Sequence, residues 1–315
     1  MTDPETAPTE EAQQTAPTQN SLYQAVFFGP NGLRAGWRVL IFVVISRVLA
    51  RALFALAFTA GFGPGLFDRL TPLSAGFGHG LVFVATVLAV LVMARFERRR
   101  FGVYGLPVRS AFQGDFWIGG LVGFAAISGA LGLIAAFHGI EISGLAIQGR
   151  TIVVATITWG IAFVLVALAE EFSYRGYLQY TLTTGIGFWP SAILLSGGFA
   201  VAHARNSGES ATGLVSVVFF ALLFCLFLRR RGNLWLAVGF HAGWDWGETF
   251  FYGTPDSGLL PSSNLLNSGF SGPHWLTGGT VGPEASIFTP LMLALVAILF
   301  SRICREKQYP VVSSQ

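Results

Sequence analysis

The chain has 315 residues, of which 53% are hydrophobic and only 11% are charged. A soluble protein of this length would carry about a quarter charged residues, so the composition excludes an ordinary soluble domain and indicates an integral membrane protein. The formal charge of +3 does not indicate a nucleic-acid partner, because the basic residues occur in short clusters between apolar runs; the expected partner is the lipid bilayer.

Residues 1–21 differ in composition from the rest of the chain. They contain four acidic residues, three prolines and no large apolar side chain beyond Met1, so they cannot bury enough surface to fold. We expect a disordered cytoplasmic tail over residues 1–21 and a single integral membrane domain over residues 22–310.

The membrane domain contains a series of long apolar windows. A membrane-crossing helix needs about 20 predominantly apolar residues, and eight windows approach or exceed this length. We therefore predict an all-α, polytopic transmembrane bundle of about eight spans, at roughly 37–61, 77–95, 116–138, 151–178, 188–204, 212–229, 233–252 and 285–303.

The basic clusters predict the orientation of these spans. The clusters at 34–38, 95–100, 229–231 and 302–307 all fall on one side of the membrane if both termini are cytoplasmic. Because cytoplasmic loops carry an excess of Lys and Arg, we predict a multi-pass protein of the cell membrane with both termini inside. The stretch 253–284, which is rich in Gly, Ser and Pro, then forms an external loop.

Two arginines interrupt the first predicted span. Arg47 and Arg51 lie one helical turn apart inside an otherwise apolar window. A charged side chain at the bilayer centre costs about 2.5–3.5 kcal/mol, so we expect both to face the bundle or a polar partner.

Spans four to seven, within a core of about residues 150–252, contain an unusual number of ionisable side chains. Several such groups exposed to lipid would together cost on the order of 10 kcal/mol, so we expect them to face one another, water, or both. The residues are Glu170, Glu171, Arg175, His203, His241, Asp245 and Glu248.

The spacing of these residues divides them into two groups. Glu171 and Arg175 are four apart in a helix, which favours an ion pair with a structural role. Glu170 has no cation at a helical spacing, which favours a functional role. By the same criterion, His79 and His138 have no partner at a telling spacing.

Three short motifs resemble those of a known family. "EEFSYR" (170–175), "FAVAH" (199–203) and "HAGWD" (241–245) match in words Glu-Glu-x-x-x-Arg, Phe-x-x-x-His and His-x-x-x-Asn or Asp. In order, spacing and placement on successive apolar segments they resemble the CPBP family of intramembrane proteases. That family includes the type II CAAX prenyl proteases, the bacteriocin-processing enzymes and the proteins described as Abi-like.

The resemblance implies an intramembrane endopeptidase, a hydrolase acting on a protein or peptide substrate. Glu170 would be the general base that activates water, helped by His203. His241 and Asp245 would polarise the scissile carbonyl and stabilise its oxyanion. Glu171 and Arg175 would hold the fourth helix in place, and Phe199 would shape the cleft.

Asp245 departs from the pattern of the eukaryotic prenyl proteases, which carry Asn there. An anionic Asp is a poor oxyanion donor unless it is protonated, so this departure favours either orienting His241 or binding a cation.

The chemistry of the same residues leaves the cofactor open. A carboxylate with two histidines can supply both a base and an oxyanion donor without a metal. Alternatively, Glu170, His203 and His241 form a set typical of catalytic zinc, as in a metalloprotease, although the His-Glu-x-x-His helix of the soluble enzymes is absent.

Two non-proteolytic functions are alternatives. A proton- or ion-coupled transporter would also place Glu, Asp and His in a wet cavity, but it would often show repeated halves and broken helices, which the sequence does not. A catalytically silent membrane scaffold or bacteriocin-immunity protein could keep the same fold, but it would not need Glu170.

Overall fold

The computed structural model describes residues 19–29, 32–206, 208–306 and 308–309. The predicted tail, residues 1–21, lies outside these residues except for its last three, which begin helix α1 (Gln19–Phe27). A small antiparallel pair, β1 (Phe28–Gly29) and β2 (Gly32–Leu33), follows α1.

The fold is an all-α helical bundle, as predicted, and each of the eight expected spans coincides with helix. Five segments are long and apolar enough to cross a membrane: α2 (Ala35–Thr59), α3 (Pro72–Phe96), α4 (Gly114–Ala136), Arg150–Ile186 and α8 (Ala211–Arg231). Three other helical segments are shorter: α7 (Phe188–His203), α11 (Phe288–Ile303), and α9 (Trp235–Asp245) with its continuation η4 (Trp246–Phe251). The chain is therefore an integral membrane protein.

The fourth segment, Arg150–Ile186, is a bent helix. It consists of α5 (Arg150–Arg175) and α6 (Tyr177–Ile186), separated by Gly176. A Cβ atom at Gly176 would lie 2.4 Å from the carbonyl oxygen of Phe172, so only glycine fits this bend. The bend leaves Glu170, Glu171 and Arg175 in the last two turns of α5.

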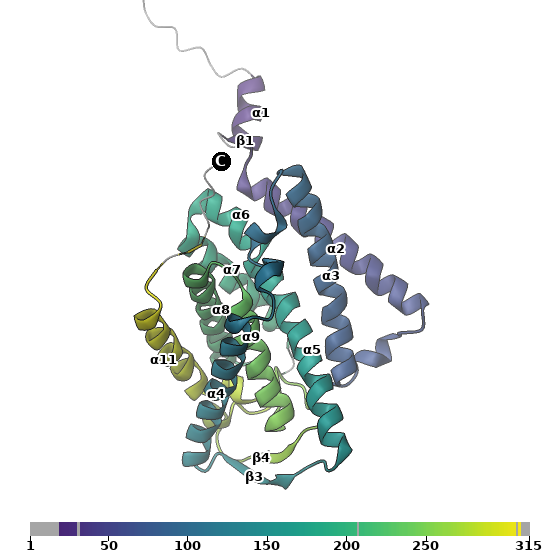
Figure 1. Cartoon of the computed structure of the whole chain (residues 1–315), viewed down its shortest axis with the longest axis vertical. Coiled ribbons are helices and arrows are strands. Elements are labelled where there is room, and N and C mark those ends of the chain that lie inside the picture. Colours follow the sequence, from purple (N-terminus) through teal and green to yellow (C-terminus); the bar gives the residue numbers. More distant parts are fainter. Residues whose placement is uncertain (1–18, 30–31, 207, 307, 310–315) are drawn as a thin grey trace, which may run out of the picture.

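The bundle has two ends, which we call the terminal end and the loop end (Figure 1). The terminal end carries α1 and α6, and Tyr309, the last described residue, packs against Tyr180 of α6. The loop end carries β3 (Ile140–Leu145), which pairs antiparallel with β4 (Leu266–Phe270). The Gly-, Ser- and Pro-rich stretch 253–284 thus contains a strand, and it also contains the short helix α10 (His274–Thr277). Short helical turns complete the connections: η1 (Pro64–Phe67), η2 (Phe101–Tyr104), η3 (Val108–Ser110) and η5 (Pro283–Ala285).

Glycines bring α4 and α9 into direct backbone contact. Each helix carries a Gly-x-x-x-Gly motif, at 119–123 and 239–243, and a Cβ atom at any of their four end glycines would come within 2.0–2.3 Å of a backbone oxygen of the other helix. Close approach through small residues is the usual basis of helix packing in membranes. His241 lies inside the second motif, so this packing fixes the position of the histidine in the bundle.

Helix α2 is the least embedded of the long helices. Only 6% of its most apolar window is buried, against 39–56% in the other four. Arg47 and Arg51 were expected to face the bundle or a polar partner; both side chains are exposed, and no described residue forms a hydrogen bond or ion pair with either, so a polar partner for them stays a prediction. The reason for their exposure is the peripheral position of α2, which packs mainly on α3 and α6.

Candidate active site

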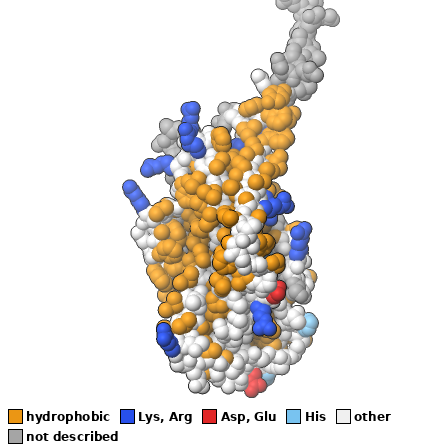
Figure 2. Space-filling view, turned by 90° about the vertical axis from the view of Figure 1, so that its right-hand side faces the viewer, with side chains coloured by type: hydrophobic (Ala, Val, Ile, Leu, Met, Phe, Trp, Pro, Cys, Tyr) orange, Lys and Arg blue, Asp and Glu red, His pale blue; other side chains and the backbone are white. Residues whose placement is uncertain are grey.

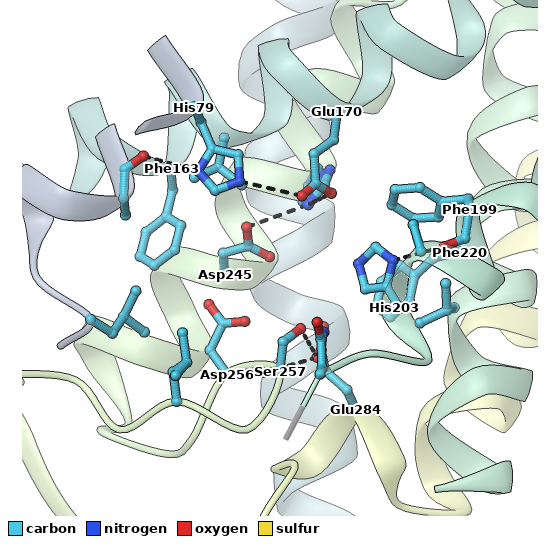
Figure 3. A pocket seen from close by; sticks show the side chains of 18 of the residues that line it. His79, Phe163, Glu170, Phe199, His203, Phe220, Asp245, Asp256, Ser257 and Glu284 are labelled. Atoms are coloured by element: carbon cyan, nitrogen blue, oxygen red, sulfur yellow. Dashed lines mark hydrogen bonds and ion pairs between the residues drawn. The ribbon is translucent and has the colours of Figure 1, made fainter. Parts of the chain in front are cut away.

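A cavity of about 500 Å³ lies among α3, α5, α7, α8 and α9 (Figure 3). Its walls bring together Glu170 and three imidazoles, those of His79, His203 and His241, with Asp245 beside them. Toward the loop end the lining comes from three chain connections: Phe67, Arg69 and Leu70 before α3; Asn206 after α7; and Asp256, Ser257, Leu259 and Glu284 after α9. The cavity is thus bordered by the loop end of the bundle.

Glu170 lies between two imidazoles. Its Oε1 atom is 3.6 Å from Nε2 of His79, and its Oε2 atom is 3.8 Å from Nε2 of His241. The side chain is 23% exposed, so water can reach it. Glu170 therefore does have imidazole partners at ion-pair distance, and these come from other helices and not from its own helix.

Glu171 and Arg175 form the expected ion pair, with 3.4 Å between Oε1 and Nη1. Both side chains are buried, with exposed fractions of 0% and 1%. The guanidinium also lies over the ring of Phe199, 4.5 Å from its centroid. Buried ions need compensation of this kind, from a counter-ion and from aromatic faces, because each has lost its hydration.

Glu171 has a second partner that its spacing does not reveal. Its Oε1 atom also accepts a hydrogen bond from Nδ1 of His241, at 3.0 Å. A carboxylate that accepts from one ring nitrogen fixes both the orientation and the tautomer of a histidine. Glu171 thus holds His241 in addition to neutralising Arg175.

Asp245 contacts the other nitrogen of His241. Its Oδ2 atom is 3.4 Å from Nε2, one helical turn along α9. Of the two roles left open for this aspartate, the contact supports orienting His241. The imidazole also stacks on Phe224, with ring centroids 5.5 Å apart, so it is held on three sides.

His203 lines the opposite wall of the cavity from His79 and Asp245 (Figure 3). Its Nδ1 atom donates to the carbonyl oxygen of Phe199 at 2.9 Å, and the two rings are in contact, with centroids 4.3 Å apart. With Nδ1 as donor, Nε2 of the neutral ring is a free acceptor. Phe199 therefore positions both His203 and Arg175.

Glu248, which shares a face of the seventh span with His241 and Asp245, does not line the cavity. It is completely buried on η4, where its Oε2 atom accepts from Nε1 of Trp244 at 2.7 Å. Glu248 therefore packs in the protein interior against the stretch 253–284.

Two carboxyl groups of the loop end face the cavity, although no motif or spacing in the sequence pointed to them. Oε2 of Glu284 accepts from the backbone N–H and the hydroxyl of Ser257, at 3.2 and 2.9 Å, and Oδ2 of Asp256 accepts from the Thr249 hydroxyl at 2.9 Å. Burial, followed by the nearby charge of Asp256, raises the pKa of Glu284 to about 8. Burial also raises the pKa of Asp256.

His79 is a further cavity residue that the sequence analysis did not predict. Its Nδ1 atom donates to the carbonyl oxygen of Ala75 at 3.0 Å, and Nε2 faces Glu170. The signal was local: His79 follows Gly76 and precedes Gly80 in an apolar helix, and a Cβ atom at Gly76 would lie only 3.3 Å from Cα of Ala162 on α5. A histidine within a small-residue packing motif indicates a helix interface, and a histidine at such an interface in the membrane needs a polar partner.

The residues proposed as zinc ligands do not fit a metal site as they are arranged. In the part of the chain that the structure describes, no three His, Cys, Asp or Glu side chains are grouped to hold a metal ion. His241 uses both nitrogens on carboxylates, and its Nε2 atom is closer to Asp245 than to Glu170.

The arrangement can instead perform acid–base chemistry on water. A partly exposed carboxylate, Glu170, faces the same space as the free acceptor nitrogen of His203. Beside Glu170 lies His241, which Glu171 and Asp245 hold and which can donate to a developing negative charge.

Comparison with known protein families gives a match over residues 151–247, which include most of the cavity-lining helices. The family model described as "Type II CAAX prenyl endopeptidase Rce1-like" matches residues 151–247. No curated protein matches the chain. The matched residues run from the first turn of α5 to the start of η4, and they contain all three motifs and every cavity residue of α5, α7, α8 and α9.

Proposed function

We propose that this integral membrane protein, whose residues 151–247 match the Rce1-like family, is an intramembrane endopeptidase that hydrolyses peptide bonds in membrane-associated protein segments. The observation that carries the proposal is the environment of Glu170: a carboxylate beside His79 and His241, within a cavity that His203 also lines.

In the proposed mechanism, a water molecule lies between Glu170 and His203. Glu170 accepts a proton from the water as it attacks the scissile carbonyl, and His203 Nε2 accepts a hydrogen bond that orients the water. Glu170 then passes the proton to the leaving amine. His79 keeps the carboxylate ionised and in place between turnovers.

The oxyanion is stabilised by His241. Glu171 accepts from Nδ1, and Asp245 keeps Nε2 protonated; when substrate binds, the Nε2–H turns from its contacts with Asp245 and Glu170 to the oxyanion. A preorganised donor of this kind contributes about 3–4 kcal/mol to lowering the barrier. Because the candidate zinc ligands do not converge, no step is assigned to a metal.

We propose further that the protein lies in the cell membrane with both termini cytoplasmic, in accord with the arginine clusters. The terminal end of the bundle is then cytoplasmic and the loop end external, so the cavity receives its water from outside. Substrate segments approach from that side or from within the bilayer.

The test is proteolysis by the purified protein in lipid nanodiscs, with a peptide library and mass spectrometry of the products. Wild type is expected to cleave, whereas Glu170→Ala and His203→Ala, with unchanged thermal transitions, are not. A chelator and elemental analysis test the metal-free mechanism: loss of cleavage together with a stoichiometric metal would contradict it. If wild type never cleaves and Glu170→Ala functions normally in cells, the protein is a scaffold.

A further inference from the structure

The exposed surface of α2 contains a regular stripe of residues. The stripe consists of Val44, Arg47, Val48, Arg51 and Ala55. Each of these residues lies three or four positions from another member of the stripe, and all five side chains are exposed. Residues at this spacing lie along one face of a helix, and the stripe is about 16 Å long. We call these five residues the α2 stripe.

The two charges of the α2 stripe lie far from both ends of the helix. Arg47 is 12 residues from Ala35 and 12 from Thr59, so its Cα atom is about 18 Å from each end along the axis. Arg51 lies one turn farther on. Figure 2, which looks onto the side of the molecule where α2 lies, shows Lys and Arg side chains beside a hydrophobic surface.

Nothing in the described chain neutralises these charges. Some other arginines of the helices do have carboxylate partners: Arg38, near the start of α2 itself, with Glu97; Arg175 with Glu171; and Arg231 with Asp115. Arg47 and Arg51 have no such carboxylate among the described residues. Each would cost about 2.5–3.5 kcal/mol at the bilayer centre, which is a large penalty for a helix that packs so little.

A second copy of the chain could not supply the missing anions. The described carboxylates within the spanning helices either face the interior, as Glu170, Glu171, Asp245 and Glu248 do, or are already paired, as Asp115 is. A lipid phosphate lies at the membrane surface, whereas the α2 stripe is centred in the span.

The geometry points to a docking site on the α2 stripe for a membrane-spanning helix of another protein that carries an acidic side chain at mid-bilayer depth. Charge complementarity selects this occupant. Val44, Val48 and Ala55 supply the small and β-branched surface that lets two helices approach closely. Arg47 and Arg51, on adjacent turns, can both donate hydrogen bonds to one carboxylate. The site is separate from the cavity and does not depend on the proposed proteolysis.

The experiment measures association in bilayers between the full-length protein and two synthetic peptides. Each peptide is a spanning helix of about 20 Leu and Ala residues; one carries Glu at its centre and the other Gln. Energy transfer between labelled peptide and labelled protein is recorded in phosphatidylcholine vesicles, with and without phosphatidylglycerol. The expected result is a preference for the Glu peptide of about tenfold or more, equivalent to ~1.4 kcal/mol.

Variants assign the preference to the α2 stripe. It should vanish in Arg47→Gln/Arg51→Gln and persist in Arg47→Lys/Arg51→Lys. In Arg47→Glu/Arg51→Glu, a third peptide that carries Lys at its centre should bind better than the Gln peptide. Arg109→Gln, a change at an exposed loop arginine, should have no effect. Equal binding of the Glu and Gln peptides by the wild type, or a preference that survives the double Gln change, would overturn the proposal. So would arginine-dependent retention of phosphatidylglycerol without peptide preference, which would indicate a lipid site, or arginine-dependent self-association, which would indicate a dimer.

Discussion

Replacing Glu171 by Gln should destabilise the bundle strongly, because it leaves the buried Arg175 guanidinium without a carboxylate. The charges are 3.4 Å apart and almost completely buried. At an effective dielectric constant of about 20 they attract by about 5 kcal/mol, and removing one partner of a buried pair typically costs about 3–5 kcal/mol. The amide that replaces the carboxylate retains an oxygen to accept from His241, so most of the loss reports the stranded cation.

The double variant Glu171→Gln/Arg175→Met separates this cause from others. It removes both charges and keeps the acceptor for His241, so it should recover most of the stability and lie within about 2 kcal/mol of wild type. The assay is reversible unfolding in mixed micelles by titration with dodecyl sulfate, with Glu141→Gln, at an exposed position on β3, as the control. A double variant as unstable as Glu171→Gln, or a single change costing less than ~1 kcal/mol, would refute the reasoning.

Three further changes test other parts of the structure. Gly239→Ala should lower the thermal transition and the rate of any cleavage together, since its methyl group would meet the Phe116 carbonyl oxygen and push away the helix that carries His241. Tyr309→Phe should be neutral or stabilising by ~1 kcal/mol in the micelle assay, because the buried hydroxyl has no partner among the described residues, whereas Tyr309→Ala should cost about 3–5 kcal/mol. The pKa of Glu284 is raised from its ordinary value of 4.5 to about 8, so the stability that this group contributes is fully present below pH 4.5 and is lost as the pH rises through about 8. The thermal transition temperature measured from pH 5 to pH 9 should therefore fall in wild type, and it should change less in Glu284→Gln. A fall of equal slope in that variant would assign the effect to other groups.

Residues that act within one helix could be predicted from the sequence. The Glu171–Arg175 ion pair and the His241–Asp245 contact follow from a spacing of four, and both are present. The apolar windows likewise located every long helix of the bundle, because a lipid environment requires long apolar segments.

Contacts between helices could not be read from spacing. His79 lies 91 residues before Glu170, and only the packing of α3 against α5 brings them together. The second partner of Glu171, the histidine of α9, depends in the same way on the packing of α5 and α9. Asp256 and Glu284 reach the cavity through a loop whose path depends on the pairing of β3 with β4.

Exposed arginines on α2 show the opposite limit. The cost of placing charge in lipid predicted that Arg47 and Arg51 face the bundle or a polar partner, but it does not say which molecule supplies that partner. Their exposure moves the expected partner to another molecule.

The most direct measurement compares the single-turnover cleavage rates of Glu170→Gln and Glu171→Gln for one peptide that wild type cleaves, with both variants in nanodiscs and verified as folded. If Glu170 is the base that activates water, its replacement should reduce the rate by about 10²–10⁴-fold, while folded Glu171→Gln, which strands Arg175 but keeps an oxygen to accept from His241, should retain measurable activity. Undiminished cleavage by folded Glu170→Gln would contradict the proposed mechanism.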